Sequence, residues 1–125
     1  MRRKMMIEVA AIFNLAFGVF HLFFWRLLNW SEQLKKVSPV NRAVFQALNI
    51  CLTFMFFLMA YVFLFHANEV YASTVGKVLL IGMAVFWCLR AVIQIYLFDL
   101  SGRIHQFLLF LFIVGIILHL IPLFF

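Results

Sequence analysis

Four long apolar stretches dominate the sequence and leave little of it for anything else. They cover, approximately, residues 6–28, 40–65, 75–98 and 103–124. A helix needs about 20 mostly apolar residues to cross a hydrocarbon core roughly 30 Å thick, and each stretch meets that length. Hydrophobic residues make up 68% of the chain and charged residues 11%, whereas soluble domains are about half apolar and a quarter charged. The sequence therefore predicts a multi-pass membrane protein with one transmembrane domain over residues 1–125.

The residues between these stretches carry signals for helix starts and turns. Ser38 followed by Pro39 is typical of a helix N-terminus, because serine caps the free N–H groups and proline fits the first turn. Ser73 or Thr74 should cap the third stretch, and Gly102 should give the chain the freedom to reverse direction before the fourth. Because the connections are short, consecutive helices should pack antiparallel. We therefore expect an all-α, up-down antiparallel four-helix bundle.

Polar side chains of the second stretch fall on one face of the predicted helix. At 100° per residue, Gln46, Asn49 and Thr53 all lie within about 40° of Arg42 around the helix axis. Lipid tails offer these groups no hydrogen-bond partners, so this face should point into the bundle or into a wet cavity. For Gln46 and Thr53, a role in helix packing is the simpler interpretation.

Polar residues of other stretches are expected at a matching depth. At about 1.5 Å per residue, His21, Asn49 and Arg90 each lie roughly 13 Å from the end formed by the first and third connections. This coincidence predicts a polar layer shared by three helices. The opposite half of the bundle should be nearly free of polar side chains, with Asn14 and His119 among its few members.

Arg90 is the most costly residue of this layer. An arginine deep in a span costs about 2.5–3.5 kcal/mol on insertion scales and usually faces protein, water or an anion. The chain has only four acidic residues, and three of them have a basic residue four positions away. One of these, Asp99, lies about 13 Å further along the helix, and the fourth acid, Glu69, lies at the other surface. We therefore expect no carboxylate beside Arg90.

Two interpretations of Arg90 follow. In the first, Asn49, Gln46, Gln94 and backbone carbonyls hold the guanidinium, or the side chain extends toward the third connection, and the network only fixes helix packing. In the second, Arg90 forms a cationic pocket with Arg42 and Arg26 that receives a lipid phosphate, a fatty-acid carboxylate or a quinone-like head. The candidate ligand-binding residues on this hypothesis are Arg90, Arg42, His21, Asn49, Gln46, Gln94 and Arg26.

Several function classes are not expected from the residues present. Cys51 and Cys88 lack the C-x-x-C spacing of thiol oxidoreductases, and their helical phase predicts a place in the apolar core. A haem held by two histidines is not expected, because His21 and His105 differ in depth by several ångströms on the same count. No nucleophile with a base, no paired carboxylates and no cofactor fingerprint is apparent. We therefore expect no enzyme, catalytic residue, cofactor, metal or nucleic-acid partner.

Three segments resemble a group of small, uncharacterised bacterial four-span membrane proteins. They are NLAFGVFHLFFWRLLNW (14–30), SPVNRAVFQALN (38–49) and FWCLRAVIQ (86–94). The resemblance implies a location in the bacterial inner (plasma) membrane, but it brings no assigned activity. The expected architecture is also loosely similar to that of DoxX-like four-span proteins, and fold similarity alone does not give a function.

The residues themselves favour a non-enzymatic module that binds an anionic lipid or another amphiphile in a polar, cationic intramembrane pocket. One alternative is an accessory subunit that docks with a larger membrane complex. Another is a small transporter, which would be an oligomer because four helices enclose little volume. The expected partners are thus membrane lipids and either a second copy of the chain or another membrane protein. Basic residues are nearly balanced between the two sides, so the membrane orientation stays open.

Overall fold

Four long helices make up most of the computed structural model, which describes residues 2–125. They are α1 (Arg2–Leu22), α4 (Pro39–Phe65), α6 (Thr74–Leu97) and α7 (Arg103–Phe124). Each is long and apolar enough to cross a membrane. Residues 2–125 contain no strand. The predicted all-α four-helix architecture is therefore confirmed, and the four apolar helices agree with a multi-pass membrane protein.

Three of the predicted stretches agree with α4, α6 and α7 to within one residue at each end. The predicted caps are also present. The Ser38 hydroxyl accepts a hydrogen bond from the Asn41 N–H at 3.2 Å, and the Ser73 hydroxyl accepts one from the Gly76 N–H at 2.9 Å. Pro39 occupies the first turn of α4, where its missing N–H removes no helical hydrogen bond.

The first stretch departs from the prediction, because its helix is not continuous to residue 28. Helix α1 ends at Leu22, and Phe23 leaves the helical conformation with φ −94° and ψ 5°. The chain reverses at Asn29, whose φ of 51° is left-handed, a conformation that asparagine tolerates better than most residues. Three short elements then lead into α4. They are α2 (Phe24–Leu27), α3 (Trp30–Gln33) and the 3₁₀ helix η1 (Leu34–Lys36).

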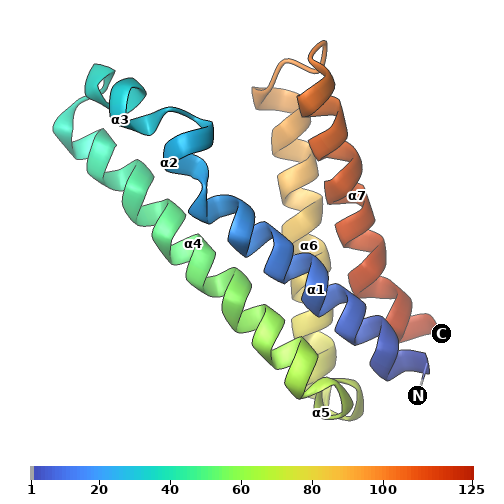
Figure 1. The fold of residues 1–125 in the computed structure, drawn as a ribbon. Coiled ribbons are helices and arrows are strands. Elements are labelled where there is room, and N and C mark those ends of the chain that lie inside the picture. The colour runs from blue at the N-terminus through green and yellow to red at the C-terminus, as the bar shows by residue number, and fades with distance from the viewer. Residues whose placement is uncertain (1) are drawn as a thin grey trace.

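The long helices form two antiparallel hairpins. Helix α1 packs against α4, α6 packs against α7, and α1 crosses α7. The short helix α5 (Ala67–Ala72) joins the hairpins and packs against α6. Figure 1 shows that the hairpins meet at the end where α5 and both chain ends lie. They diverge toward the other end, where α2 and α3 lie on one side and the α6–α7 turn on the other. We call these the closed end and the open end.

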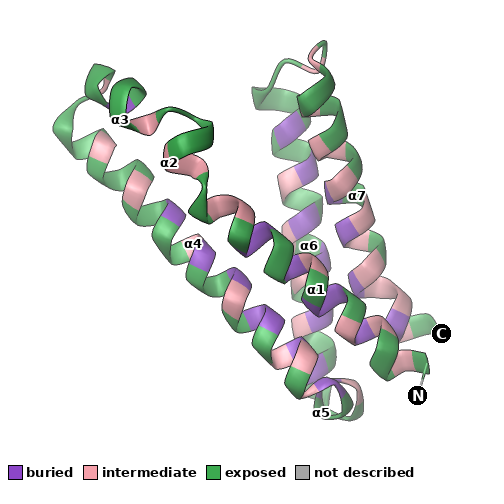
Figure 2. Ribbon diagram, in the orientation of Figure 1, coloured by how far each residue is buried: buried purple, intermediate pink, exposed green. Residues whose placement is uncertain are grey.

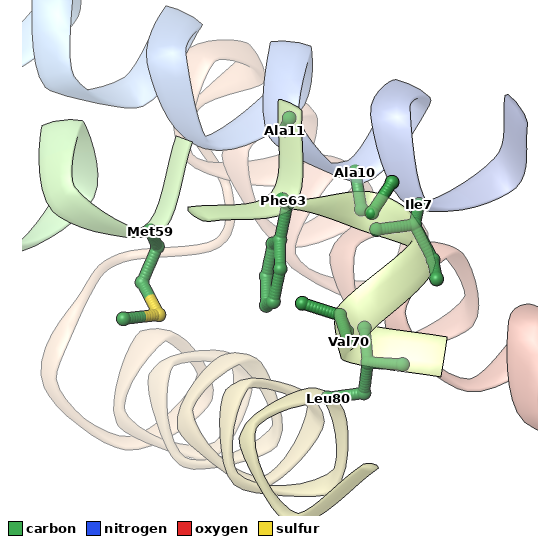
Figure 3. Packing of buried hydrophobic residues seen from close by; sticks show 8 residues of the cluster. Ile7, Ala10, Ala11, Met59, Phe63, Val70 and Leu80 are labelled. Carbon is green, nitrogen blue, oxygen red and sulfur yellow. The ribbon is translucent and has the colours of Figure 1, made fainter. Parts of the chain in front are cut away.

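An apolar cluster holds the closed end together. Ile7 and Ala10 of α1, Phe63 of α4 and Leu80 of α6 are each fully buried, and Val70 of α5 is 3% exposed. Figure 3 shows these side chains converging from the separate helices. Figure 2 shows that buried residues face the neighbouring helices, whereas the outer faces are largely exposed. Exposed apolar side chains on the outer faces are expected where a span contacts lipid.

A second, aromatic cluster lies nearer the open end. The Trp87 indole is 1% exposed and stacks between Phe56 and Phe112, at interplanar angles of 17° and 21°. Gly115 permits this packing, because a Cβ there would lie 2.9 Å from both the Trp87 Cγ and the Phe13 ring. Trp87 therefore joins α6 to α4 and α7 at the level where the hairpins begin to separate.

The α6–α7 turn does not use glycine as predicted. Gly102 has φ −79° and ψ 136°, which any residue can adopt, so the prediction that its conformational freedom reverses the chain is wrong. The Asp99 carboxylate instead accepts a hydrogen bond from the Ser101 N–H at 3.0 Å. The hydrogen bonds from Ser101 lower the pKa of Asp99, because they stabilise its charged form. A local side-chain turn thus replaces the expected glycine turn.

The contact between α5 and α6 generates the first prediction. A methyl group at Gly76 would overlap the backbone of Val70, which cannot move aside as a flexible side chain could. We expect Gly76→Ala to destabilise the protein by about 1–3 kcal/mol, as overpacking does elsewhere. The measurement is the apparent melting temperature in detergent, followed by circular dichroism.

Gly82 on the same helix provides the matched control, since nothing lies within 4 Å of a Cβ placed there. Gly82→Ala should keep or raise the melting temperature, because alanine is the better helix former. Equal melting temperatures for the two variants would contradict the proposed contact.

Candidate functional site

A cavity of about 550 Å³ lies between the hairpins on the open side of the Trp87 cluster. All four long helices and α2 contribute to its wall, which is mostly aromatic and aliphatic. Phe17 and Phe20 come from α1, Phe56 from α4 and Phe112 from α7. The polar side chains of the wall are those of His21, Trp87, Arg90 and His105. The cavity is therefore an apolar chamber with a few polar groups, as is usual for sites that bind small molecules.

Arg90 brings a positive charge to this wall. Its guanidinium carbon lies 4.5 Å from the centre of the Phe112 ring and 5.1 Å from that of Phe98, so two aromatic faces attract the cation. Its Nη1 atom is buried and has no hydrogen-bond partner among residues 2–125. The Asp99 carboxylate, the nearest acid in sequence, is bonded to Ser101. In the described part of the chain, the ion pairs are Lys35–Glu32 and His66–Glu69, so none neutralises Arg90.

His21 offers a hydrogen-bond acceptor on the same wall. Its Nδ1 lies 2.7 Å from the Phe17 carbonyl oxygen. Because a carbonyl can only accept, Nδ1 carries the proton, and in the neutral ring Nε2 has a free lone pair. The ring stacks on Phe24 with centres 4.4 Å apart. These contacts fix the orientation of the imidazole.

His105 and Trp87 add further polar groups that the sequence analysis did not include among the candidate residues. The His105 Nδ1 and the Trp87 Nε1 are both buried and have no partner among the described residues. The His105 ring lies 5.4 Å from that of Phe98, which also contacts Arg90. The signal for His105 was its position near the open end of α7. Counted along the helix, however, His105 lies closer to the surface than His21, so the two histidines were not expected to line the same cavity.

Asn49 and Gln94 lie behind the wall, although the sequence placed them with the ligand-binding residues. The Asn49 Nδ2 donates to the backbone carbonyl of His21 at 2.9 Å, and the Gln94 Nε2 donates to that of His105 at 3.0 Å. His21 lies in the last turn of α1, where carbonyls lose their helical partners, so Asn49 satisfies one of them. Each amide thus fixes the backbone of one wall histidine within its own hairpin.

The first interpretation of Arg90 included amide side chains among its partners, and the structure contradicts those contacts. In residues 2–125, neither Asn49 nor Gln94 donates to or accepts from Arg90. Gln46 accepts from the Trp25 indole at 3.0 Å and donates to the Arg42 carbonyl at 3.2 Å, also away from Arg90. Aromatic faces hold the guanidinium instead.

Arg42 and Arg26 do not join Arg90 in the wall of the cavity. The Arg42 Nε donates to the Leu34 carbonyl at 2.9 Å, and Arg26 is exposed on α2. The physical reason is the break at Phe23, because the chain after it folds back along the start of α4 and brings Leu34 beside Arg42. The cavity wall therefore contains one arginine and not the three that were predicted.

One further expectation needs correction. Cys51 and Cys88 are exposed on the outer faces and do not belong to the core. The closed half of the bundle contains the polar residues expected there, and a buried hydrogen bond of 2.8 Å joins the Asn14 Nδ2 to the His119 Nε2. The His119 Nδ1 donates to the Gly115 carbonyl at 2.6 Å, so Nε2 is the acceptor.

Comparison with known proteins identifies no relative. No family model, curated protein or solved structure matches the chain. The resemblance to bacterial four-span proteins and to DoxX-like proteins therefore stays a prediction.

The Asn14–His119 hydrogen bond generates the second prediction. Both residues are fully buried and link α1 to α7, so removing one partner leaves the other without its hydrogen bond. We expect Asn14→Ala and His119→Ala each to destabilise the protein by about 1–3 kcal/mol. A double-mutant cycle on thermal or denaturant unfolding should give a coupling energy of roughly 0.6–1.7 kcal/mol, the range measured for membrane hydrogen bonds. Strictly additive effects would show that the bond contributes nothing.

Proposed function

We propose that this protein binds an anionic amphiphile from the bilayer in the cavity between its two hairpins. The observation that carries the proposal is the Arg90 guanidinium in the wall of an otherwise apolar cavity, with no acid paired to it among the described residues. Desolvation makes an unpaired charge costly, and buried polar atoms normally have partners. A ligand carrying a negative charge would remove this cost.

The unpartnered groups favour a head that offers several acceptor oxygens. Arg90 Nη1 and Trp87 Nε1 can only donate, and His105 Nδ1 can donate in one tautomer. The free Nε2 of His21 can accept from a protonated oxygen of the same head. Carboxylate and phosphate groups fit this set, because arginine binds both through charge-assisted hydrogen bonds.

The remaining wall fits the apolar part of such a ligand. Phenylalanines and leucines form most of it, and its volume of about 550 Å³ lies within the usual range of roughly 300–1,000 Å³ for small-molecule sites. The head would lie at Arg90 with the tail along the aromatic rings. The wall carries no paired carboxylates and no nucleophile beside a base, so we propose binding and not catalysis.

The third prediction concerns retention of amphiphiles by Arg90 variants. We expect purified protein to bind oleate more tightly than a neutral monoacylglycerol with the same chain, because only oleate carries a charge for Arg90. Arg90→Gln should weaken oleate binding by about 10- to 150-fold, the equivalent of a hydrogen bond to a charged group. Binding is measured by native mass spectrometry and by titration in detergent.

Arg26→Gln is the matched control, because it removes the same charge at the same end of the bundle from an exposed position. It should leave oleate binding unchanged. Equal losses in both variants, or equal binding of both ligands by the unaltered protein, would refute the proposal. Stoichiometric protein partners without bound amphiphile would instead support an accessory subunit. Arg90-dependent flux of the anion into vesicles would support a transporter.

A further inference from the structure

A second group of cations lies at the closed end, where α1 begins and α5 leads into α6. The guanidinium carbon of Arg3 lies 4.6 Å from the centre of the Tyr71 ring. The ammonium nitrogen of Lys77 lies 5.5 Å from the same centre. Two positive charges that share one ring repel each other, while the ring attracts both only weakly. This arrangement leaves a surplus of positive charge at one point.

Acidic residues do not balance this surplus. The described residues of the closed end include two acids, Glu8 and Glu69, and Glu69 lies 3.2 Å from the His66 ring nitrogen. Neither Arg3 nor Lys77 forms an ion pair within residues 2–125. Arg3 and Lys77 are therefore available to an anion from outside the chain.

The closed-end cluster holds the Tyr71 ring and the backbone on either side of the two cations in place before any ligand arrives. Ile7 lies one turn after Arg3, Val70 directly precedes Tyr71, and Leu80 lies three residues after Lys77. All three apolar residues belong to the same buried cluster (Figure 3). Little conformational freedom of the backbone would be lost on binding, and this favours affinity.

We propose that Arg3, Lys77 and Tyr71 form a phosphate-binding clamp, and that the bilayer supplies the phosphate as the head of an anionic phospholipid. Both cations lie in the first turns of helices long and apolar enough to cross a membrane. The ends of such a span are expected near the headgroups, where lipid phosphates lie. The arginine can bind two phosphate oxygens through its planar fork, and the lysine adds a compact point charge. This site is separate from the cavity and does not depend on the function proposed for it.

The test compares phosphatidylglycerol with phosphatidylcholine by native mass spectrometry of full-length protein from mixed nanodiscs. The double variant Arg3→Gln/Lys77→Gln should lower the preference for phosphatidylglycerol about 25-fold, or fivefold for each cation. The matched control, Arg2→Gln/Lys4→Gln, removes the same charge from exposed positions of the same helix turn. It should change the preference less than fivefold. Both pairs are repeated in the Arg90→Gln background, so that lipid bound in the cavity does not enter the comparison.

Three outcomes would overturn the proposal. An equal loss of the preference for phosphatidylglycerol in the two double variants would show that diffuse surface charge, and not a clamp, causes the preference. An unchanged preference in Arg3→Gln/Lys77→Gln would exclude the residues themselves. Displacement of phosphatidylglycerol by inorganic phosphate at similar concentration would overturn the lipid source and leave free phosphate as the ligand. Tyr71→Leu keeps an apolar side chain packed against the cluster, so the fold should be retained. It should reduce the preference in part, because it removes the ring that both cations face.

Discussion

The absence of hydrogen-bond partners in lipid is the constraint on which the rest of the structure depends. Each amide or imidazole inside the spans must find its partner within the protein. Asn14 meets His119, while Asn49 and Gln94 each meet a backbone carbonyl of the neighbouring helix. Several buried polar atoms still have no partner in the described chain, including the side-chain oxygens of Asn49 and Gln94. Arg90 differs from these amides because it carries a permanent charge, and that charge faces aromatic rings. The proposed binding role rests on this charge at the wall of a cavity.

The two hairpins contribute to this cavity in equivalent ways. In one, the α4 residue Asn49 holds the backbone of His21, and in the other the α6 residue Gln94 holds that of His105. Each histidine also packs against a phenylalanine of its own hairpin. The polar groups of the cavity are thus fixed on rigid elements, which is what selective recognition requires. Asn49 and Gln94, which the helical phase predicted as ligand-binding residues, instead hold the histidines of the cavity wall in position.

Local patterns predicted the fold well, whereas the site depended on features that no local pattern contains. Hydropathy and the Ser38 cap fixed the ends of α4, since both act within a few residues. The break at Phe23 was not visible, because the hydropathy of that segment continues without interruption. The hypothesis of one cationic pocket also grouped Arg42 and Arg26 with Arg90, although neither contributes to the cavity wall. A buried pair between helices far apart in sequence likewise requires knowledge of which helices cross.

The single polar link between the hairpins has a mechanical consequence. Among the described residues, the Asn14–His119 pair is the one side-chain hydrogen bond that joins the α1–α4 hairpin to the α6–α7 hairpin, and it lies toward the closed end. Asn49 and Gln94 each donate a hydrogen bond within their own hairpin. The Asn14–His119 pair therefore joins the hairpins near the closed end, and no side-chain hydrogen bond among the described residues joins them at the open end. Toward the open end, the contact between the hairpins therefore depends on apolar packing around Trp87, which leaves the width of the cavity to be set by aromatic rings and not by directional bonds.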